Sequence, residues 1–173
     1  MQIEDITANC TVLVGTYRTE KSQQDWILGV NPIRQEILYN VRHNRDIFAN
    51  RNGGITSLSK PDFVLLYDYH TLTGSGHLFE CLSFSVVTED DMRLMQYPQP
   101  NGSYIIYRLG EEVDTDFIDV QTIISEHMAR HGNYIEGAPF TISADYLRQH
   151  IKPKPIVKLS VTCNKKEVIR FVD

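Results

Sequence analysis

Histidines and cysteines are the side chains of this 173-residue sequence that could most directly bind a metal or attack a substrate. His127 and His131 lie four residues apart, and on a helix this spacing places two imidazoles on one face, where they could bind a metal. Both residues also fall in the last turn of an expected helix, where histidine is favoured by the helix dipole. We favour the second interpretation, and the sequence contains neither an HExxH nor an HxH motif.

Cysteine chemistry is not expected either. Cys10, Cys81 and Cys163 are odd in number and far apart, which argues against a disulfide framework and against a thiolate metal site. Cys81 stands in the middle of an expected strand, whereas a reactive thiol needs an exposed, electropositive site. We therefore expect a buried structural cysteine. The sequence also lacks a G-x-S-x-G motif and a P-loop, which favours a protein that is not an enzyme.

Two acidic residues lie on strands that are expected to pair as a hairpin. Asp62 follows Pro61, and Glu80 comes about twenty residues later, in the segment 79–82. This pattern resembles the PD-(D/E)xK nuclease signature. The resemblance implies that Asp62 and Glu80 bind Mg²⁺ together and that a lysine two residues after the glutamate helps to activate water. Leu82 occupies that lysine position, so the resemblance implies a degenerate, inactive nuclease-like domain.

A longer stretch, roughly residues 24–109, resembles the PUA-like superfamily and especially its EVE branch. In this stretch a Trp-bearing strand leads into Asn31-Pro32, and a later strand, 61–69, ends in aromatic residues before a return strand. The resemblance implies a non-catalytic domain that holds a nucleobase, often a modified one, in an aromatic-lined pocket. It implies the following ligand-binding residues: Trp26, Asn31, Tyr67 and Tyr69.

A third hypothesis is a protein-interaction or structural role. The sequence contains nine tyrosines, and three of them, Tyr97, Tyr104 and Tyr107, lie close together. Tyrosine is enriched where proteins bind one another. Base recognition remains the leading hypothesis, with nucleic acid or a nucleotide-like ligand as partner. The degenerate nuclease and the protein-interaction module are the alternatives.

The elements that must position these residues follow from apolar patterning, turn residues and helix caps. Strands are expected over 10–17, 25–30, 61–69, 78–87 and 103–109, with a terminal hairpin in PIVKLSVTC and EVIRFVD. Helices are expected over 32–49, 88–96, 114–132 and 143–151. Because the strands come in hairpin groups, the class is α+β. We expect one domain over 1–173, with a curved, mostly antiparallel sheet or partly open β-barrel and about three packed helices.

Composition limits the possible partners. Apolar residues make up 42% of the sequence, enough for a substantial core, and the net charge is −5. A domain that binds nucleic acid mainly through phosphate charge is usually basic, so broad electrostatic binding is disfavoured. A local basic face stays open, either at Arg42, Arg45 and Arg51 or among the C-terminal lysines. No apolar run is long enough to span a membrane and no secretory signal is present, so we expect a cytoplasmic protein.

Overall fold

The computed structural model describes residues 1–17, 36–43, 59–132, 134, 137–153, 156–161 and 166–171, the last two segments as backbone. The strands are β1 (Thr11–Tyr17), β2 (Ile37–Arg42), β3 (Phe63–Asp68), β4 (His77–Val87), β5 (Tyr104–Glu112), β6 (Phe117–Ile118), β7 (Phe140–Ser143), β8 (Ile151–Lys152), β9 (Ile156–Val161) and β10 (Lys166–Phe171). The helices are the 3₁₀ turn η1 (Ile3–Asp5), α2 (Glu89–Leu94), α3 (Val120–Arg130) and α4 (Ala144–Arg148). The expected strand over 25–30 lies outside the described residues.

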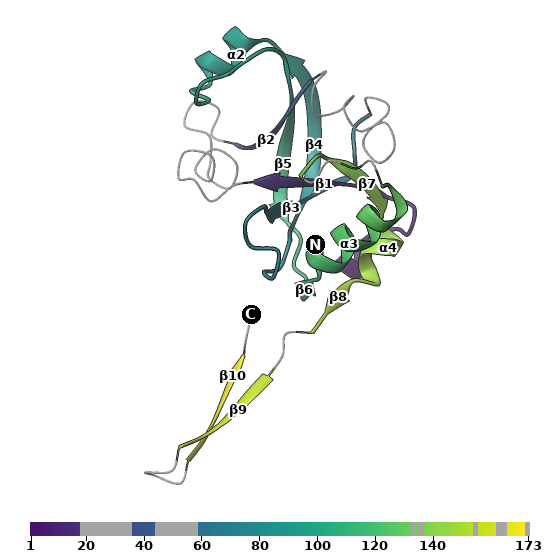
Figure 1. The fold of residues 1–173 in the computed structure, drawn as a ribbon, viewed down its shortest axis with the longest axis vertical. Coiled ribbons are helices and arrows are strands. Elements are labelled where there is room, and N and C mark those ends of the chain that lie inside the picture. Colours follow the sequence, from purple (N-terminus) through teal and green to yellow (C-terminus); the bar gives the residue numbers. More distant parts are fainter. Residues whose placement is uncertain are drawn as a thin grey trace.

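A six-stranded sheet forms the centre of the molecule, in the order β2-β5-β4-β3-β1-β7 (Figure 1). Strands β1 and β3 are parallel, and the other neighbouring pairs are antiparallel. The α+β class and the mostly antiparallel sheet are therefore confirmed. The described sheet is open, with β2 and β7 as its two edges, and closure into a barrel is not confirmed.

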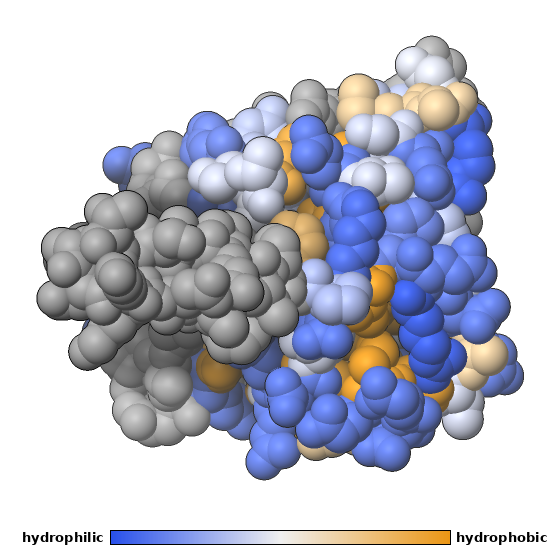
Figure 2. Space-filling model, turned by 90° about the horizontal axis from the view of Figure 1, so that it is seen from below, coloured by the Kyte–Doolittle hydropathy of each residue, from blue (hydrophilic) through white to orange (hydrophobic). Residues whose placement is uncertain are grey.

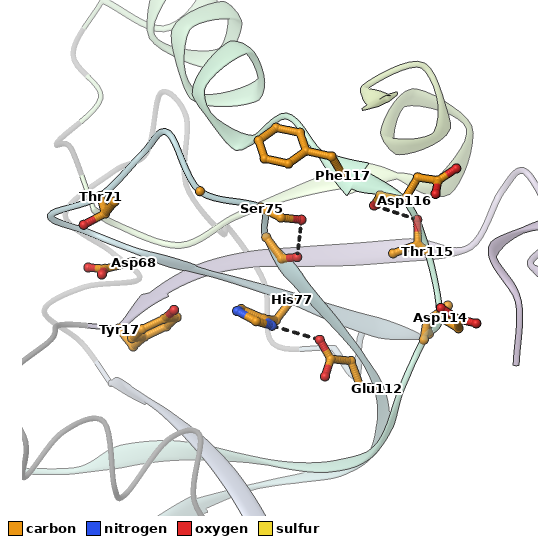
Figure 3. A pocket seen from close by; sticks show the side chains of 13 residues that line it. Tyr17, Asp68, Thr71, Ser75, His77, Glu112, Asp114, Thr115, Asp116 and Phe117 are labelled. Atoms are coloured by element: carbon orange, nitrogen blue, oxygen red, sulfur yellow. Dashed lines mark hydrogen bonds and ion pairs between the residues drawn. The ribbon is translucent and has the colours of Figure 1, made fainter. Parts of the chain in front are cut away.

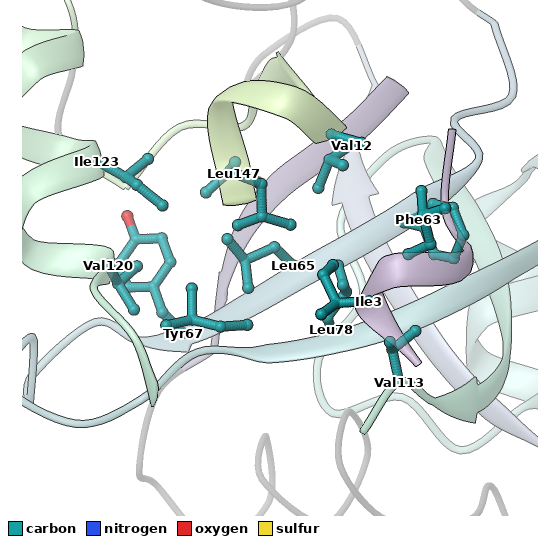
Figure 4. Close-up of a cluster of buried hydrophobic side chains, with 14 of the residues drawn as sticks. Ile3, Val12, Phe63, Leu65, Tyr67, Leu78, Val113, Val120, Ile123 and Leu147 are labelled. Atoms are coloured by element: carbon teal, nitrogen blue, oxygen red, sulfur yellow. The ribbon is translucent and has the colours of Figure 1, made fainter. Parts of the chain in front are cut away.

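Apolar clusters cover both faces of the inner strands. On one face, Leu65 and Val12 pack with Ile123 of α3 and Leu147 of α4 (Figure 4). On the opposite face, Leu13 and Val64 belong to a second cluster that includes residues of β2 and β5. A strand that is buried on both faces reads as a continuous apolar run rather than as an alternating one. This explains the sequences TVLV in β1 and FVLLY in β3.

The sheet curls so that its β2 edge approaches β1, and aromatic side chains fill the space between them. Phe84, Tyr107 and Tyr39 are register partners on β4, β5 and β2, and their rings stack with centroid separations of 6.1 and 6.0 Å. The Tyr39 ring reaches β1, where it lies against the backbone of Gly15. A β-carbon added at Gly15 would stand 2.2 Å from the Tyr39 hydroxyl oxygen. The glycine therefore makes room for a ring from the edge strand.

The helix expected over 32–49 is wrong for residues 37–42, which form strand β2, whereas residues 32–35 and 44–49 lie outside the described residues. Leu38 points into the cluster covered by α2, whereas Tyr39 and Val41 point to the opposite face of the sheet. Successive residues therefore point to opposite faces of the sheet, which is the period of a strand. Pairing of the whole of β2 with β5 overrides the helical spacing of its apolar residues.

The helix expected over 114–132 begins later than predicted, at Val120. The side chain of Asp119 accepts a hydrogen bond from the backbone N–H of Thr122 at 3.1 Å and so caps the helix. Phe117 and Ile118 instead pair with β8. Other predicted elements within the described residues are confirmed: α2 begins after the Thr88 cap, and β9 pairs with β10. Helix α4 begins after the Ser143 cap but ends at Arg148, earlier than the expected end at residue 151, which lies in β8.

The helices lie at separate places on the sheet. Figure 1 shows α3 and α4 side by side near β7, α2 at the far end near β5, and the β9–β10 hairpin projecting away from the sheet. None of the described helices combines the length and apolar character that crossing a membrane requires. On the end of the molecule drawn in Figure 2, hydrophilic residues cover most of the coloured surface, and apolar residues show in a band between them.

Candidate functional site

A pocket of about 620 Å³ opens at one end of the sheet, where β1 and β3 finish and β4 begins (Figure 3). One wall is the 69–76 loop between β3 and β4, and the opposite wall is the connection from β5 to β6. The residues that line it are Tyr17, Asp68, Thr71, Gly74, Ser75, Gly76, His77, Glu112, Val113, Asp114, Thr115, Asp116 and Phe117. Its volume is in the usual range for small-molecule sites.

His77 and Glu112 form the polar centre of this pocket. The Nδ1 atom of His77 and the Oε1 atom of Glu112 lie 2.9 Å apart, joining β4 to β5. Both side chains remain in contact with solvent, with 40% and 52% of their surface exposed. The Tyr17 ring lies beside the imidazole, with ring centroids 6.4 Å apart and planes inclined by 53°. Figure 3 shows these three side chains together on the floor of the pocket.

The charge of the pocket is negative. Four carboxylates line it, and none of its described lining residues is lysine or arginine. Burial raises the pKa of the Tyr17 hydroxyl group, and the negative charges of Asp68 and Glu112 raise it further. Tyr17 therefore carries a neutral hydroxyl group at physiological pH. The pocket offers carboxylate acceptors, one phenol and one imidazole.

The loop wall is fixed by hydrogen bonds to the opposite wall. The Gly76 N–H donates to the carbonyl of Ile118 at 3.3 Å, and the hydroxyl of Ser75 accepts from the Ile118 N–H at 3.0 Å. A β-carbon at Gly76 would stand 2.7 Å from the Leu65 side chain, so a larger residue would displace Leu65 where the loop meets the core. At the start of the loop, the Asp68 carboxylate accepts from the His70 N–H at 2.9 Å.

The residues implied by the PUA-like resemblance do not line this pocket. Tyr67 is 2% exposed and belongs to the core cluster beneath α3, where Figure 4 places its ring near Val120 and Ile123. Tyr69 is half-buried, and its ring lies against Gly137. Trp26 and Asn31 lie outside the described residues.

Asp62 immediately precedes β3, Glu80 lies on the neighbouring strand β4, and the two residues are offset in register. Phe63, not Asp62, is the partner of Glu80, and alternation along the two strands directs the two carboxylates to opposite faces. The Asp62 carboxylate instead accepts a hydrogen bond from the Thr11 N–H at 2.8 Å. The nearby ammonium of Lys60 donates to the Cys81 carbonyl at 3.0 Å. No group of three or more His, Cys, Asp and Glu side chains suited to a metal ion occurs in the part of the chain that the structure describes.

His127 is a core residue. Its ring stacks on Phe140 at a centroid separation of 3.7 Å and an angle of 10°, and it is 4% exposed. The His131 ring lies 4.7 Å away, inclined by 42°. Cys81 is also buried, and burial raises the pKa of its thiol, as expected of a structural cysteine.

Comparison of the chain with known protein families, with curated proteins and with solved structures found no match. The pocket therefore has to be interpreted from its own chemistry.

Sequence reasoning missed Tyr17, His77 and Glu112 as a group, because they come from three different strands. A usable signal was present in the acidic run at 111–116, where Glu, Asp and Thr gather after a strand. A second was the GSG turn beside His77. Only the sheet order shows that the acidic run and the turn face each other across one pocket.

Proposed function

We propose that this protein is a non-catalytic binding module whose pocket takes a small ligand, or the tip of a side chain, that carries an ammonium or guanidinium group. One observation carries the proposal: four carboxylates line the pocket, and none of its described lining residues is basic. Like charges gathered in a partly enclosed space attract a counter-ion of opposite sign. A cation is therefore the ligand class that this pocket favours.

The aromatic residues support the same ligand class. Tyr17 lies beside His77, which contacts the Glu112 carboxylate, and the face of a tyrosine ring attracts cations within about 6 Å. The pocket is large enough for a lysine or arginine side chain presented by a protein partner as well as for a free amine. A protein partner of this kind agrees with the third hypothesis from the sequence.

The arrangement of polar groups favours binding rather than covalent catalysis. Ser75 is the hydroxyl residue nearest in sequence to the His77–Glu112 pair, but its hydroxyl group donates to the Gly76 carbonyl at 3.1 Å. The same hydroxyl group accepts a hydrogen bond from the Ile118 N–H, so both of its hydrogen bonds hold the loop in place. No described hydrogen bond joins Ser75 to His77, whereas an activated serine needs a base within hydrogen-bond reach.

Calorimetric titration with Nα-acetyl-lysinamide tests the proposal, with the uncharged Nα-acetyl-norleucinamide as control ligand. We expect the lysine derivative to bind and the norleucine derivative not to bind. Glu112→Gln removes one pocket charge and should weaken binding by about five- to thirtyfold, the effect of roughly 1–2 kcal/mol at a partly exposed site. Glu111→Gln is the matched control, because Glu111 is adjacent and exposed but does not line the pocket. Equal affinity of the two variants would contradict the proposal.

Base recognition is the second candidate, and the presence of two rings in one pocket favours it. Carboxylates accept hydrogen bonds from the amino groups of nucleobases, and rings stack on their faces. In this form of the hypothesis, Tyr17 and His77 take the place of Tyr67 and Tyr69. Cytidine and guanosine should then bind, and Tyr17→Leu should weaken both. Absence of nucleoside binding together with retained amine binding would exclude this candidate.

A further inference from the structure

We propose that His77 makes ligand binding in this pocket dependent on pH, by exchanging a proton for the cationic ligand. This inference rests on the proposed function, because it assigns a regulator to the same pocket. Its starting observation is that the imidazole is in hydrogen-bond contact with a carboxylate that a cation would use. The ligand and a proton on His77 therefore compete for the charge of Glu112.

The direction of the effect follows from charge. When His77 is neutral, its Nδ1–H can donate to Glu112 and the carboxylate keeps its full negative charge for a ligand. When His77 is protonated, the imidazolium neutralises Glu112 and adds a positive charge inside the pocket. A cationic ligand is repelled by that charge, so its affinity falls as the pH falls. By linkage, binding of the ligand drives the proton from His77.

The other titratable groups around His77 do not account for this pH dependence of ligand binding. They are Tyr17 of β1, Asp68 of β3, Glu112 of β5, and Asp114 and Asp116 of the connection to β6. Burial and the neighbouring carboxylates raise the pKa of Tyr17, so its hydroxyl stays neutral over the range in question. Between about pH 5.5 and about pH 8, imidazole is the one ordinary side chain type that changes its charge, and carboxyl groups generally stay ionised.

Position separates His77 from the other described histidines. His70 is exposed at the start of the 69–76 loop and contacts the Tyr69 ring edge-on, with centroids 5.3 Å apart, but it does not line the pocket. His127 stacks in the core. His70 is therefore a matched control: it is a histidine close in sequence to His77 but outside the pocket.

The test is calorimetric titration of the whole chain with Nα-acetyl-lysinamide at about pH 5.5 and about pH 8, each in two buffers of different ionisation enthalpy. The side-chain amine of this probe stays protonated throughout. We expect the wild-type affinity to be about three- to tenfold weaker at the lower pH, and binding near pH 6.5 to release part of a proton to the buffer. His70→Gln should behave like the wild type.

His77→Gln should lose both effects, so that its affinities at the two pH values agree and no proton is released. The NMR resonances of the His77 imidazole in the wild-type chain provide an independent measure of the loss of its proton on ligand binding. Adding the ligand at constant pH near 6.5 should move them toward their position in the neutral form. Binding that is independent of pH, or proton release that persists in His77→Gln, would overturn the inference and leave the proposed function in place. Absence of binding at both pH values would overturn both.

Discussion

The ring of Tyr39 on β2 lies against the backbone of Gly15 on β1, although β5, β4 and β3 stand between these two strands in the sheet. The contact exists because the sheet coils far enough to bring its β2 edge over β1. Both residues face the cluster that also contains Leu13 and Tyr107. Tyr39 is 4% exposed, so the ring has little freedom to move aside.

Gly15→Ala should therefore destabilise the protein. The new methyl group would stand 2.2 Å from the Tyr39 hydroxyl oxygen and 2.5 Å from the ring carbon that bears it, which forces the ring or the strand to shift. Overpacking of this kind costs about 1–3 kcal/mol. Urea unfolding measures the change. Gly132→Ala serves as control, because no atom lies within 4 Å of the added carbon. Equal stability of the two variants would show that the Tyr39 ring of β2 is not packed tightly against Gly15 of β1.

The Asp119 cap should make the protein sensitive to acid. Burial alone would raise the pKa of Asp119, but hydrogen bonds from Lys152, at 2.7 Å, and from Thr122 outweigh burial and lower it. A carboxyl whose pKa is lowered by folding stabilises the folded state above its unfolded pKa of about 3.9, and this stabilisation is lost as the pH falls through the folded value.

Asp119→Asn keeps a capping side chain but removes the charge. It should cost about 0.5–1 kcal/mol at pH 7, and the difference from the wild type should shrink as the pH falls below the unfolded pKa of about 3.9. Asp119→Ala removes the cap as well and should cost about 1–2 kcal/mol at pH 7. Urea unfolding at the two pH values gives both numbers. A constant difference between Asp119→Asn and the wild type would contradict a role for the charge.

Tyr67 should prove to be a core residue rather than a ligand contact. Replacing a buried aromatic residue by alanine costs about 3–5 kcal/mol, and Tyr67 is 2% exposed beneath α3. Tyr69→Ala should cost clearly less, because Tyr69 is only half-buried. Tyr67→Phe keeps the ring and should bind lysine derivatives or nucleosides as the wild type does. Loss of nucleoside binding in Tyr67→Phe would restore the assignment that the PUA-like resemblance implied.

A phosphate group should weaken binding in the pocket. Four carboxylates line it, and a phosphate monoester brings roughly two further negative charges at neutral pH. Guanosine 5′-monophosphate should therefore bind at least about tenfold more weakly than guanosine at low salt, and the difference should narrow at high salt. NMR titration with the two compounds measures this. Tighter binding of the monophosphate would place the nucleotide outside this pocket.

The sequence predicted those elements in which local pattern and tertiary environment agree. β3 is a run of large apolar residues bounded by turn residues, and it is a strand in the structure. Residues 37–42 form a strand, although Ile37, Leu38 and Val41 fit one face of a helix as well as they fit a strand. The deciding contact, Tyr39 opposite Tyr107, comes from a strand far away in the sequence. Pairing of this kind leaves no local signal.

The start of α3 shows a different limit. Asp114 and Asp116 are the acidic residues expected in the first turn of a helix, but the residue that caps α3 is Asp119. Between them, Phe117 and Ile118 are drawn into pairing with β8, which local sequence cannot reveal. The pocket was unpredictable for the same reason. Tyr17, His77 and Glu112 become neighbours only through the sheet order.

The place of β1 in the sheet also has a kinetic consequence. β1 lies between β3 and β7, so residues 12–17 pair with 63–68 on one side and residues 11–14 pair with 140–143 on the other. Contacts between such distant residues require large loops to close before any pairing energy is gained, which slows folding. We therefore expect the complete sheet to form on the timescale of milliseconds to seconds. During synthesis on the ribosome, β1 has to remain without its second neighbour until nearly all of the described chain has emerged.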